Sequence, residues 1–98
     1  MSYSLIILPA VERELTEIRA EREQRDGRAV LAELAAVFGK IRERPRRYPI
    51  AYAQVHRALT PRFHFAIFFE IAEDRAEITI LAVLHQRQDP ALWPKRQR

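Results

Sequence analysis

The first quarter of the chain passes from a short apolar run to a helical pattern of apolar positions. Residues 2–8 (SYSLIIL) are apolar and partly β-branched, which predicts a short buried strand. Pro9 follows, and proline suits the first turn of a helix, where its missing N–H needs no partner. Apolar side chains then recur with helical spacing at Val11, Leu15 and Ile18. We therefore expect a helix over residues 10–25.

The next apolar positions also have helical spacing. They are Leu31, Leu34, Phe38 and Ile41, with Ala35 between them. This stripe predicts a helix over residues 28–43 that ends before Pro45. Gly27 is expected to follow the end of the first helix, so the break is short and the two helices pack antiparallel. Gly39 lies inside the second helix, where it marks either a close approach to the sheet or a weak turn.

Three strand-like runs fill the second half, after a connector over residues 44–52 with two prolines and three arginines. The runs cover residues 52–59, 62–72 and 77–85, separated by turns at Thr60-Pro61 and at residues 73–76. The predicted order is β-α-α-β-β-β. Short turns between the last three strands favour an antiparallel meander with the helical hairpin on one face. We therefore expect an α+β fold with a small, mainly antiparallel sheet.

Length and composition narrow the class of protein. The 98 residues, 48% of them hydrophobic, suffice for one domain, which we expect over residues 1–98 with a basic extended tail over residues 89–98. The chain has no cysteine, which excludes disulfides and thiolate metal sites and fits a reducing compartment. No apolar run has the length of a membrane span. A soluble, cytoplasmic protein without a membrane segment is expected.

Charge is distributed unevenly along the chain. The formal net charge is +4, made up of −2 over residues 1–39 and +6 over residues 40–98. A basic half suggests a polyanion or an acidic partner, and the alternative is a solvated surface rich in arginine.

Histidines and arginines gather at one end of the predicted sheet. A tight turn at Thr60-Pro61 would place His56 opposite His64, and a similar turn at residues 73–76 would place His85 near Phe63 or His64. The residues expected together are His56, His64, His85, Arg57, Arg62 and Arg87. A register slip of one residue would turn any of these side chains to the other face of the sheet.

Three interpretations of this cluster stay open. Metal binding has the least support, because no carboxylate is well placed among the histidines, and we predict neither a metal nor another cofactor. A ribonuclease site would use His85 as acid or base and Arg57, Arg62 and Arg87 to stabilise the phosphate. The third interpretation is binding without chemistry, in which the arginines contact an acidic protein or a phosphate.

Three segments of the sequence resemble a known family. LPAVERELTEI, PIAYAQVHRALTPRFHFAIFFEI and ITILAVLHQRQDPALWPKR are similar to the RelE/ParE toxins of bacterial type II toxin–antitoxin systems. The resemblance covers residues 4–96. It implies two helices packed on a small sheet, and a protein that blocks bacterial growth until a cognate antitoxin neutralises it.

The resemblance implies two possible mechanisms. RelE-like toxins cleave mRNA on the ribosome, and here Arg57, Arg62, His85 and Arg87 would fill the catalytic roles. The chain lacks the tyrosine after the last strand and the paired lysines of that branch, since its only lysines are Lys40 and Lys95. ParE-like toxins inhibit DNA gyrase, and the ending LAVLHQRQDPALW is more similar to them. Gyrase inhibition is therefore ranked first, and whether the protein is an enzyme stays open. The target-binding residues would be Arg57, Arg62, His85, Arg87 and Trp93.

A partner surface is expected on the helical hairpin and the connector. The narrow stripe of Val11, Leu15 and Ile18, together with Arg46 and Arg47, would bind a disordered acidic segment of the antitoxin. That segment would also add a strand to a sheet edge. A further alternative is a non-toxic binding module of the same fold, which would leave growth unaffected when expressed without an antitoxin.

Overall fold

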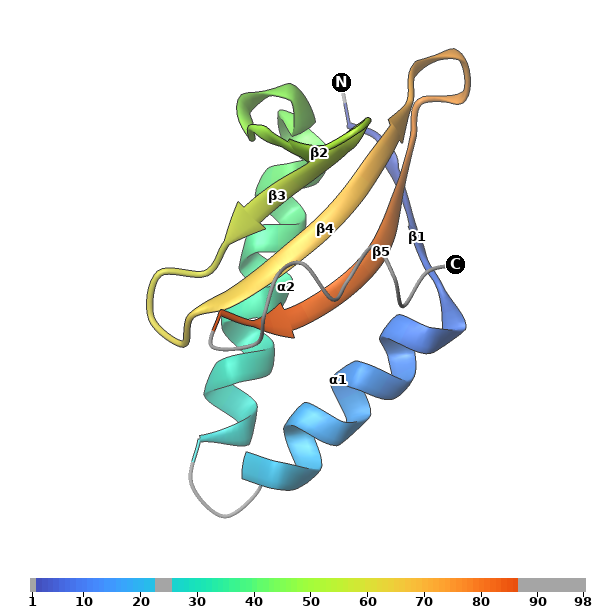
Figure 1. The fold of residues 1–98 in the computed structure, drawn as a ribbon. Coiled ribbons are helices and arrows are strands. Elements are labelled where there is room, and N and C mark those ends of the chain that lie inside the picture. Colours follow the sequence, from blue (N-terminus) through green and yellow to red (C-terminus); the bar gives the residue numbers. More distant parts are fainter. Residues whose placement is uncertain (1, 23–25, 87–98) are drawn as a thin grey trace.

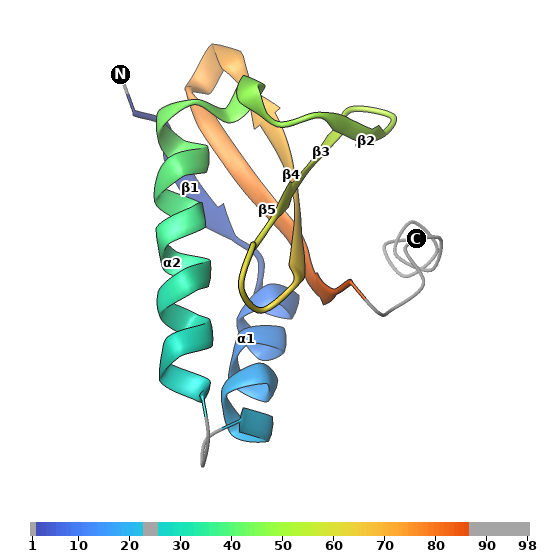
Figure 2. The same ribbon diagram turned by 90° about the vertical axis from the view of Figure 1, so that its left-hand side faces the viewer.

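The computed structural model describes residues 2–22 and 26–86, arranged as two helices on one face of a five-stranded sheet (Figures 1 and 2). In chain order the elements are β1 (Ser4–Ile7), α1 (Pro9–Arg22), α2 (Gly27–Glu43), the 3-10 helix η1 (Pro45–Arg47), β2 (Ile50–Tyr52), β3 (Val55–Leu59), β4 (Phe65–Ala72), the 3-10 helix η2 (Glu73–Arg75) and β5 (Glu77–His85). The expected α+β fold and helical hairpin are confirmed.

The strands lie in the order β1-β5-β4-β3-β2. β1 is parallel to β5, and every other pair is antiparallel, so the sheet is mixed. β2 was not predicted, because it forms inside the connector and all three of its residues are exposed, with Ile50 61% exposed. A strand with no buried face has no alternation of apolar and polar residues to reveal it.

The first residues of the two helices are Pro9 and Gly27. α1 starts at Pro9, and the N–H of Val11 in its first turn donates to the carbonyl of Leu8 at 2.9 Å. α2 starts at Gly27, which we had expected to follow α1 as its C-terminal cap. A Cβ at this position would lie 3.2 Å from the carbonyl oxygen of Arg19, so glycine permits the close approach of the two helices. Gly27 therefore begins α2 and allows the two helices to pack closely, and it does not cap α1 as predicted.

The core lies between α2 and the sheet. The buried apolar side chains of α2 are Val30, Leu34, Val37 and Ile41. The predicted stripe was thus correct at Leu34 and Ile41, whereas Leu31 and Phe38 are partly buried at its margin and Ala35 is exposed. The sheet contributes the other half of the core through Ala58, Phe65, Ile67, Phe69, Ile78, Ile80 and Val83. This burial of large apolar side chains is the main favourable term in folding.

A second apolar cluster lies on the opposite face of the sheet. Its buried members are Val55, Ala66, Phe68, Ala82 and Leu84. Along β5, the core-facing side chains change from even-numbered to odd-numbered residues, because a bulge interrupts the pairing of β5 with β4. Phe68 pairs with Ala82 and Phe69 with Ile80, so Leu81 is the extra residue. After the bulge, Val83 faces the helices and Leu84 faces away from them.

Within the described part of the chain, neither helix has the length and apolar character needed to cross a membrane.

Replacement by alanine should have opposite effects on the stability of the protein at the two glycines, Gly27 and Gly39. Gly39 is exposed inside α2, and nothing lies within 4 Å of a Cβ built there, so it marks no close approach to the sheet. Gly39→Ala should stabilise the protein by about 0.5–1 kcal/mol, because alanine has the higher helix propensity. Gly27→Ala should destabilise it by about 1–3 kcal/mol, because backbone atoms of α1 must move.

Urea unfolding of the two variants beside the parent protein measures both effects. Stabilisation by Gly27→Ala equal to that by Gly39→Ala would contradict the close approach of α1 and α2.

Candidate functional site

The turn between β3 and β4 is longer than the sequence predicted, and it is held by side chains. Leu59 pairs with Ala66, so residues 60–64 form the turn. Thr60 is fully buried, and its hydroxyl accepts the N–H of Phe65 at 2.8 Å. Glu33 of α2 accepts the N–H groups of two turn residues, Arg62 at 2.7 Å and Phe63 at 3.0 Å. The turn is therefore fixed to α2 by one carboxylate.

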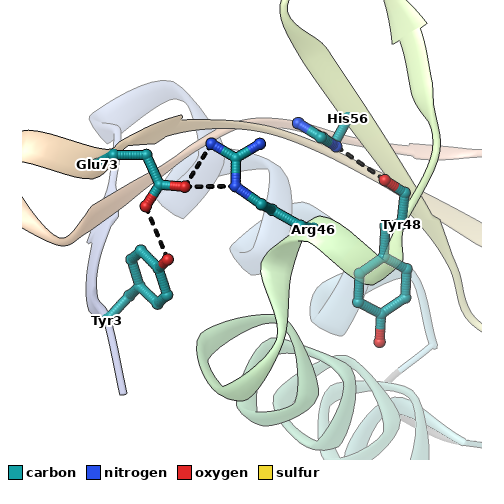
Figure 3. Close-up of polar contacts among 5 residues, drawn as sticks. All are labelled: Tyr3, Arg46, Tyr48, His56 and Glu73. Carbon is teal, nitrogen blue, oxygen red and sulfur yellow. Dashed lines mark hydrogen bonds and ion pairs between the residues drawn. The ribbon is translucent and has the colours of Figure 1, made fainter. Parts of the chain in front are cut away.

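This longer turn overturns the predicted grouping of the three histidines. His56 pairs with Phe69 and not with His64, so it lies away from the turn. Its ring is 8% exposed, stacks on Phe69 at 5.3 Å, and donates from Nδ1 to the carbonyl of Tyr48 at 2.8 Å (Figure 3). A buried, hydrogen-bonded ring of this kind belongs to the core. His64 is exposed in the turn with a positive φ of 64°.

His85 does lie beside the turn, as expected. It pairs with Phe65, one residue beyond His64, and its ring meets the Phe65 ring edge-on at 5.2 Å. The N–H of the next residue, Gln86, donates to the carbonyl of His64 at 2.8 Å.

The predicted arginines diverge to different surfaces. Arg57 pairs with Phe68 and so lies on the face of the sheet that the helices do not cover. The guanidinium of Arg62 lies over the ring of Phe63 at 4.6 Å, and Phe63 packs against the core on the helix side. The two cations therefore do not form one phosphate clamp. Arg87 and Trp93 lie outside the described residues.

Arg57 and His85 meet at a small hollow on the helix-free face of the sheet. We call this the sheet hollow. Its volume is about 200 Å³, and it is lined by Arg57, Leu59, Ala66, Phe68, Leu84, His85 and Gln86. Its floor is apolar, and Leu59 at the rim is 47% exposed. An apolar floor with one guanidinium and one imidazole suits the binding of an apolar side chain beside an acidic group.

The sheet hollow offers less for catalysis. Cleavage of a phosphodiester needs a base, an acid and several cations around the phosphate. Of the described titratable residues, Arg57 and His85 line it. Among residues 2–22 and 26–86, no group of three histidines or carboxylates is placed to hold a metal ion.

The residues expected to bind an antitoxin occupy different environments. Val11 is fully buried in the core, so the stripe of α1 that we expected at an interface is partly a core stripe. Leu15 and Ile18 are partly buried beside it. Arg47 is exposed in η1, whereas Arg46 forms an ion pair with Glu73 (Figure 3). Arg46 therefore has a structural partner within the chain.

That ion pair belongs to a network that joins three parts of the chain. Tyr3, before β1, donates its hydroxyl to Glu73 Oε1 at 2.8 Å, and Arg46 of η1 donates to Oε2 (Figure 3). These two hydrogen bonds lower the pKa of the Glu73 carboxyl from its ordinary value of 4.5. The same bond raises the pKa of the Tyr3 hydroxyl, because it stabilises the protonated phenol.

Several residues at this site were not predictable from sequence. Glu33 supports the turn from α2, and no local pattern connects it to residues 62 and 63. Leu59, Phe68 and Leu84 line the sheet hollow, but apolar residues in strands are ordinarily assigned to the core. Alternation along β3 is the one signal that would have placed Arg57 and Leu59 on the same face.

Comparisons with known proteins point to one group. The family model described as the ParE toxin of the type II toxin–antitoxin system parDE matches residues 5–90. A comparison with curated protein sequences gave no match.

Solved structures share the fold at low sequence identity. The isolated RelE toxin of E. coli aligns over 99% of this chain and 98% of its own, with a TM-score of 0.71 and 11% identity. A chain of the Mycobacterium tuberculosis RelBE2 toxin–antitoxin complex aligns over 87% of this chain and 99% of its own, with a TM-score of 0.68 and 19% identity. A chain of the intact E. coli RelBE complex gives a TM-score of 0.69 at 10% identity, covering 86% of this chain and 96% of its own.

The Glu73 network predicts a pH-dependent effect on stability. Because the folded protein lowers the pKa of Glu73, the network stabilises the fold above the ordinary pKa of 4.5. That contribution is lost as the pH falls through the lowered value, where the carboxyl becomes protonated. Glu73→Gln should therefore reduce the free energy of unfolding at pH 7, and the difference from the parent should shrink in acid.

Chemical denaturation at pH 7 and at pH 3 measures this difference. Asp74→Asn is the matched control, because Asp74 is the neighbouring carboxylate, 77% exposed and 3.6 Å from Arg75. A Glu73→Gln effect that is equal at both pH values would contradict the network.

Proposed function

Because the chain belongs to the ParE toxin family of type II toxin–antitoxin systems, we propose that it blocks bacterial growth by inhibiting DNA gyrase and that a cognate antitoxin neutralises it. The observation that carries this choice of target is the composition of the sheet hollow. The sheet hollow combines an apolar floor with Arg57. Arg62 lies on another surface, over the ring of Phe63. Such a hollow favours protein binding over phosphodiester cleavage.

In this proposal the sheet hollow binds gyrase through one apolar anchor. Leu59, at its exposed rim, and Arg57 contact the target directly, and His85 closes the hollow at the end of β5. A volume of about 200 Å³ lies below the ~300–1,000 Å³ of small-molecule pockets, so a single side chain is the fitting occupant. Arg62 lies on the neighbouring turn, and Arg87 and Trp93 follow β5 in the sequence, so they extend the proposed target-binding set.

The antitoxin is proposed because structures with this fold include toxin–antitoxin complexes. Its contacts are proposed at Leu15, Ile18 and Arg47. Arg46 stays bound to Glu73 in this arrangement, and Val11 stays in the core. An acidic segment of the antitoxin would meet the exposed cations of the connector, which lies in the basic half of the chain.

Ribosome-dependent cleavage of mRNA is the second candidate function. The observation that favours it is that His85 and Arg57 line the same hollow, which places one possible acid or base near one cation. It predicts loss of activity in His85→Ala even where binding is retained.

The purified protein should inhibit supercoiling by gyrase and trap DNA cleavage complexes. Leu59→Asp and Arg57→Ala should each weaken inhibition by about tenfold or more, because each removes about 1.4 kcal/mol or more from a central contact. Lys40→Ala is the matched control for Arg57→Ala, because it removes the same charge from an exposed position on α2. It should leave inhibition unchanged.

Two results would overturn the proposal. Normal supercoiling at high toxin concentration, combined with ribosome-dependent mRNA cleavage that His85→Ala abolishes, would establish the RelE-like mechanism. Normal growth of cells that express the protein without an antitoxin would instead favour a non-toxic binding module.

A further inference from the structure

A second hollow lies on the face of the sheet that the helices cover, between α1 and the C-terminal residues of β5. We call it the α1 groove. Its volume is about 280 Å³. Ile18, Phe65 and Val83 give it apolar walls, and Glu14, Glu17 and Glu21 give it an acidic rim. It is a surface distinct from the sheet hollow, although Leu84 and His85 line both.

The groove follows from the unequal lengths of β1 and β5. β1 ends at Ile7, which pairs with Ile80, whereas β5 continues to His85. Beyond Ile80, α1 runs along β5 in place of a strand (Figure 1). A helix lies farther from a strand than another strand does, because its side chains must fit between them. The α1 groove occupies part of that wider space.

The backbone of β5 already binds a side chain in this region. The carboxylate of Glu14 accepts the N–H of Val83 at 3.1 Å. A side chain from α1 thus takes the position that a strand partner would otherwise occupy. An extended peptide is the kind of ligand that suits a strand bordered by an apolar groove.

The charge of the α1 groove decides which peptide fits. Glu14, Glu17 and Glu21 share one face of α1, because their spacing is close to two helical turns. Like charges at positions i and i+4, such as Glu17 and Glu21, destabilise a helix, and a bound cation relieves this repulsion. The groove is therefore acidic although the whole chain has a net charge of +4.

Arg22 is the one arginine among the described residues that line the groove, and it is already engaged. Arg22 donates to Asp26 at 3.1 Å, and its guanidinium lies over the rings of Phe63 and Phe65 at 5.8 and 5.7 Å. It holds the α1–α2 corner to the sheet and does not neutralise the three glutamates. Nucleic acid is excluded as the ligand, because its phosphates would be repelled by the rim.

From the apolar walls, the strand backbone and the acidic rim, we propose that the α1 groove binds a short extended segment of the antitoxin in which basic residues alternate with apolar ones. That the partner is the antitoxin rests on the proposed function. Ile18, already proposed as an antitoxin contact, lines the groove. The same antitoxin presents acidic residues to Arg47 and basic residues to α1, so it is recognised by the order of its charges.

Two peptides that share their apolar residues test the chemistry of the groove. The first is acetyl-Leu-Arg-Leu-Lys-Leu-amide and the second is acetyl-Leu-Glu-Leu-Asp-Leu-amide. Titration of each into the labelled full chain, followed by backbone amide NMR shifts, locates binding. The basic peptide should shift the amides of Ile18 and Val83, and the acidic peptide should not. Equal binding of both peptides, or shifts confined to other surfaces, would overturn the proposal.

A charge reversal on α1 provides the matched variant. Glu17→Lys combined with Glu21→Lys should weaken binding of the basic peptide by about tenfold or more, from lost attraction at short range. The double variant keeps a like-charge pair at positions i and i+4, so helix stability changes little. Glu12→Lys is the control: it reverses an exposed charge on the same helix, outside the groove, and should leave the affinity within about twofold.

Co-purification with the antitoxin, measured beside gyrase inhibition, tests this inference separately from the proposed function. The double variant should lose co-purification with the co-expressed antitoxin while it still inhibits gyrase. Undiminished co-purification of the double variant would overturn the role of the groove. Absence of gyrase inhibition by the parent protein would overturn only the proposed target, because the peptide titration does not depend on gyrase.

Discussion

The bulge at Leu81 determines which side chains of the last strand face the helices. Before it, Ile78 and Ile80 point into the core under α1 and α2, and after it Val83 does. If the same residues paired regularly with β4, with no bulge, Ala82 and Leu84 would take the core positions. The floor of the sheet hollow would then lose Leu84, and the wall of the α1 groove would lose Val83. Both candidate surfaces therefore depend on a single irregular pair of strands.

Two surfaces of opposite character result from this arrangement. The sheet hollow is apolar with a guanidinium at its side, and the α1 groove is apolar with carboxylates at its rim. Leu84 and His85 border both, because they stand at the end of β5, where the two surfaces approach each other. A partner bound at one surface therefore lies next to residues that also line the other surface. Under our two proposals, the antitoxin and the target therefore bind at adjacent surfaces of this molecule.

The periodic parts of the fold were predictable from sequence, and the long-range details were not. The helices and β5 follow from apolar spacing, which local backbone geometry enforces. The predicted position of His56 was wrong because the turn after β3 is longer than expected. Its length depends on Glu33 and Thr60, and Glu33 is remote from the turn in sequence. The bulge has no local signature in β5. These two features set the surfaces on which Arg57, Arg62 and His85 lie. The sequence therefore brought Arg57 and His85 together, but it did not show that Arg62 lies on another surface.

The parallel pairing of β1 with β5 has a consequence for the synthesis of the protein. β1 is made first, but the strand to which it bonds is the last one described, and it pairs over nearly the full length of the described chain. Contacts of such high sequence separation form slowly and only when both segments are present. A nascent chain that stops before β5 has neither the partner of β1 nor the wall against which α1 packs. The complete fold therefore forms only after β5 has been made, and products truncated before β5 lack both candidate surfaces.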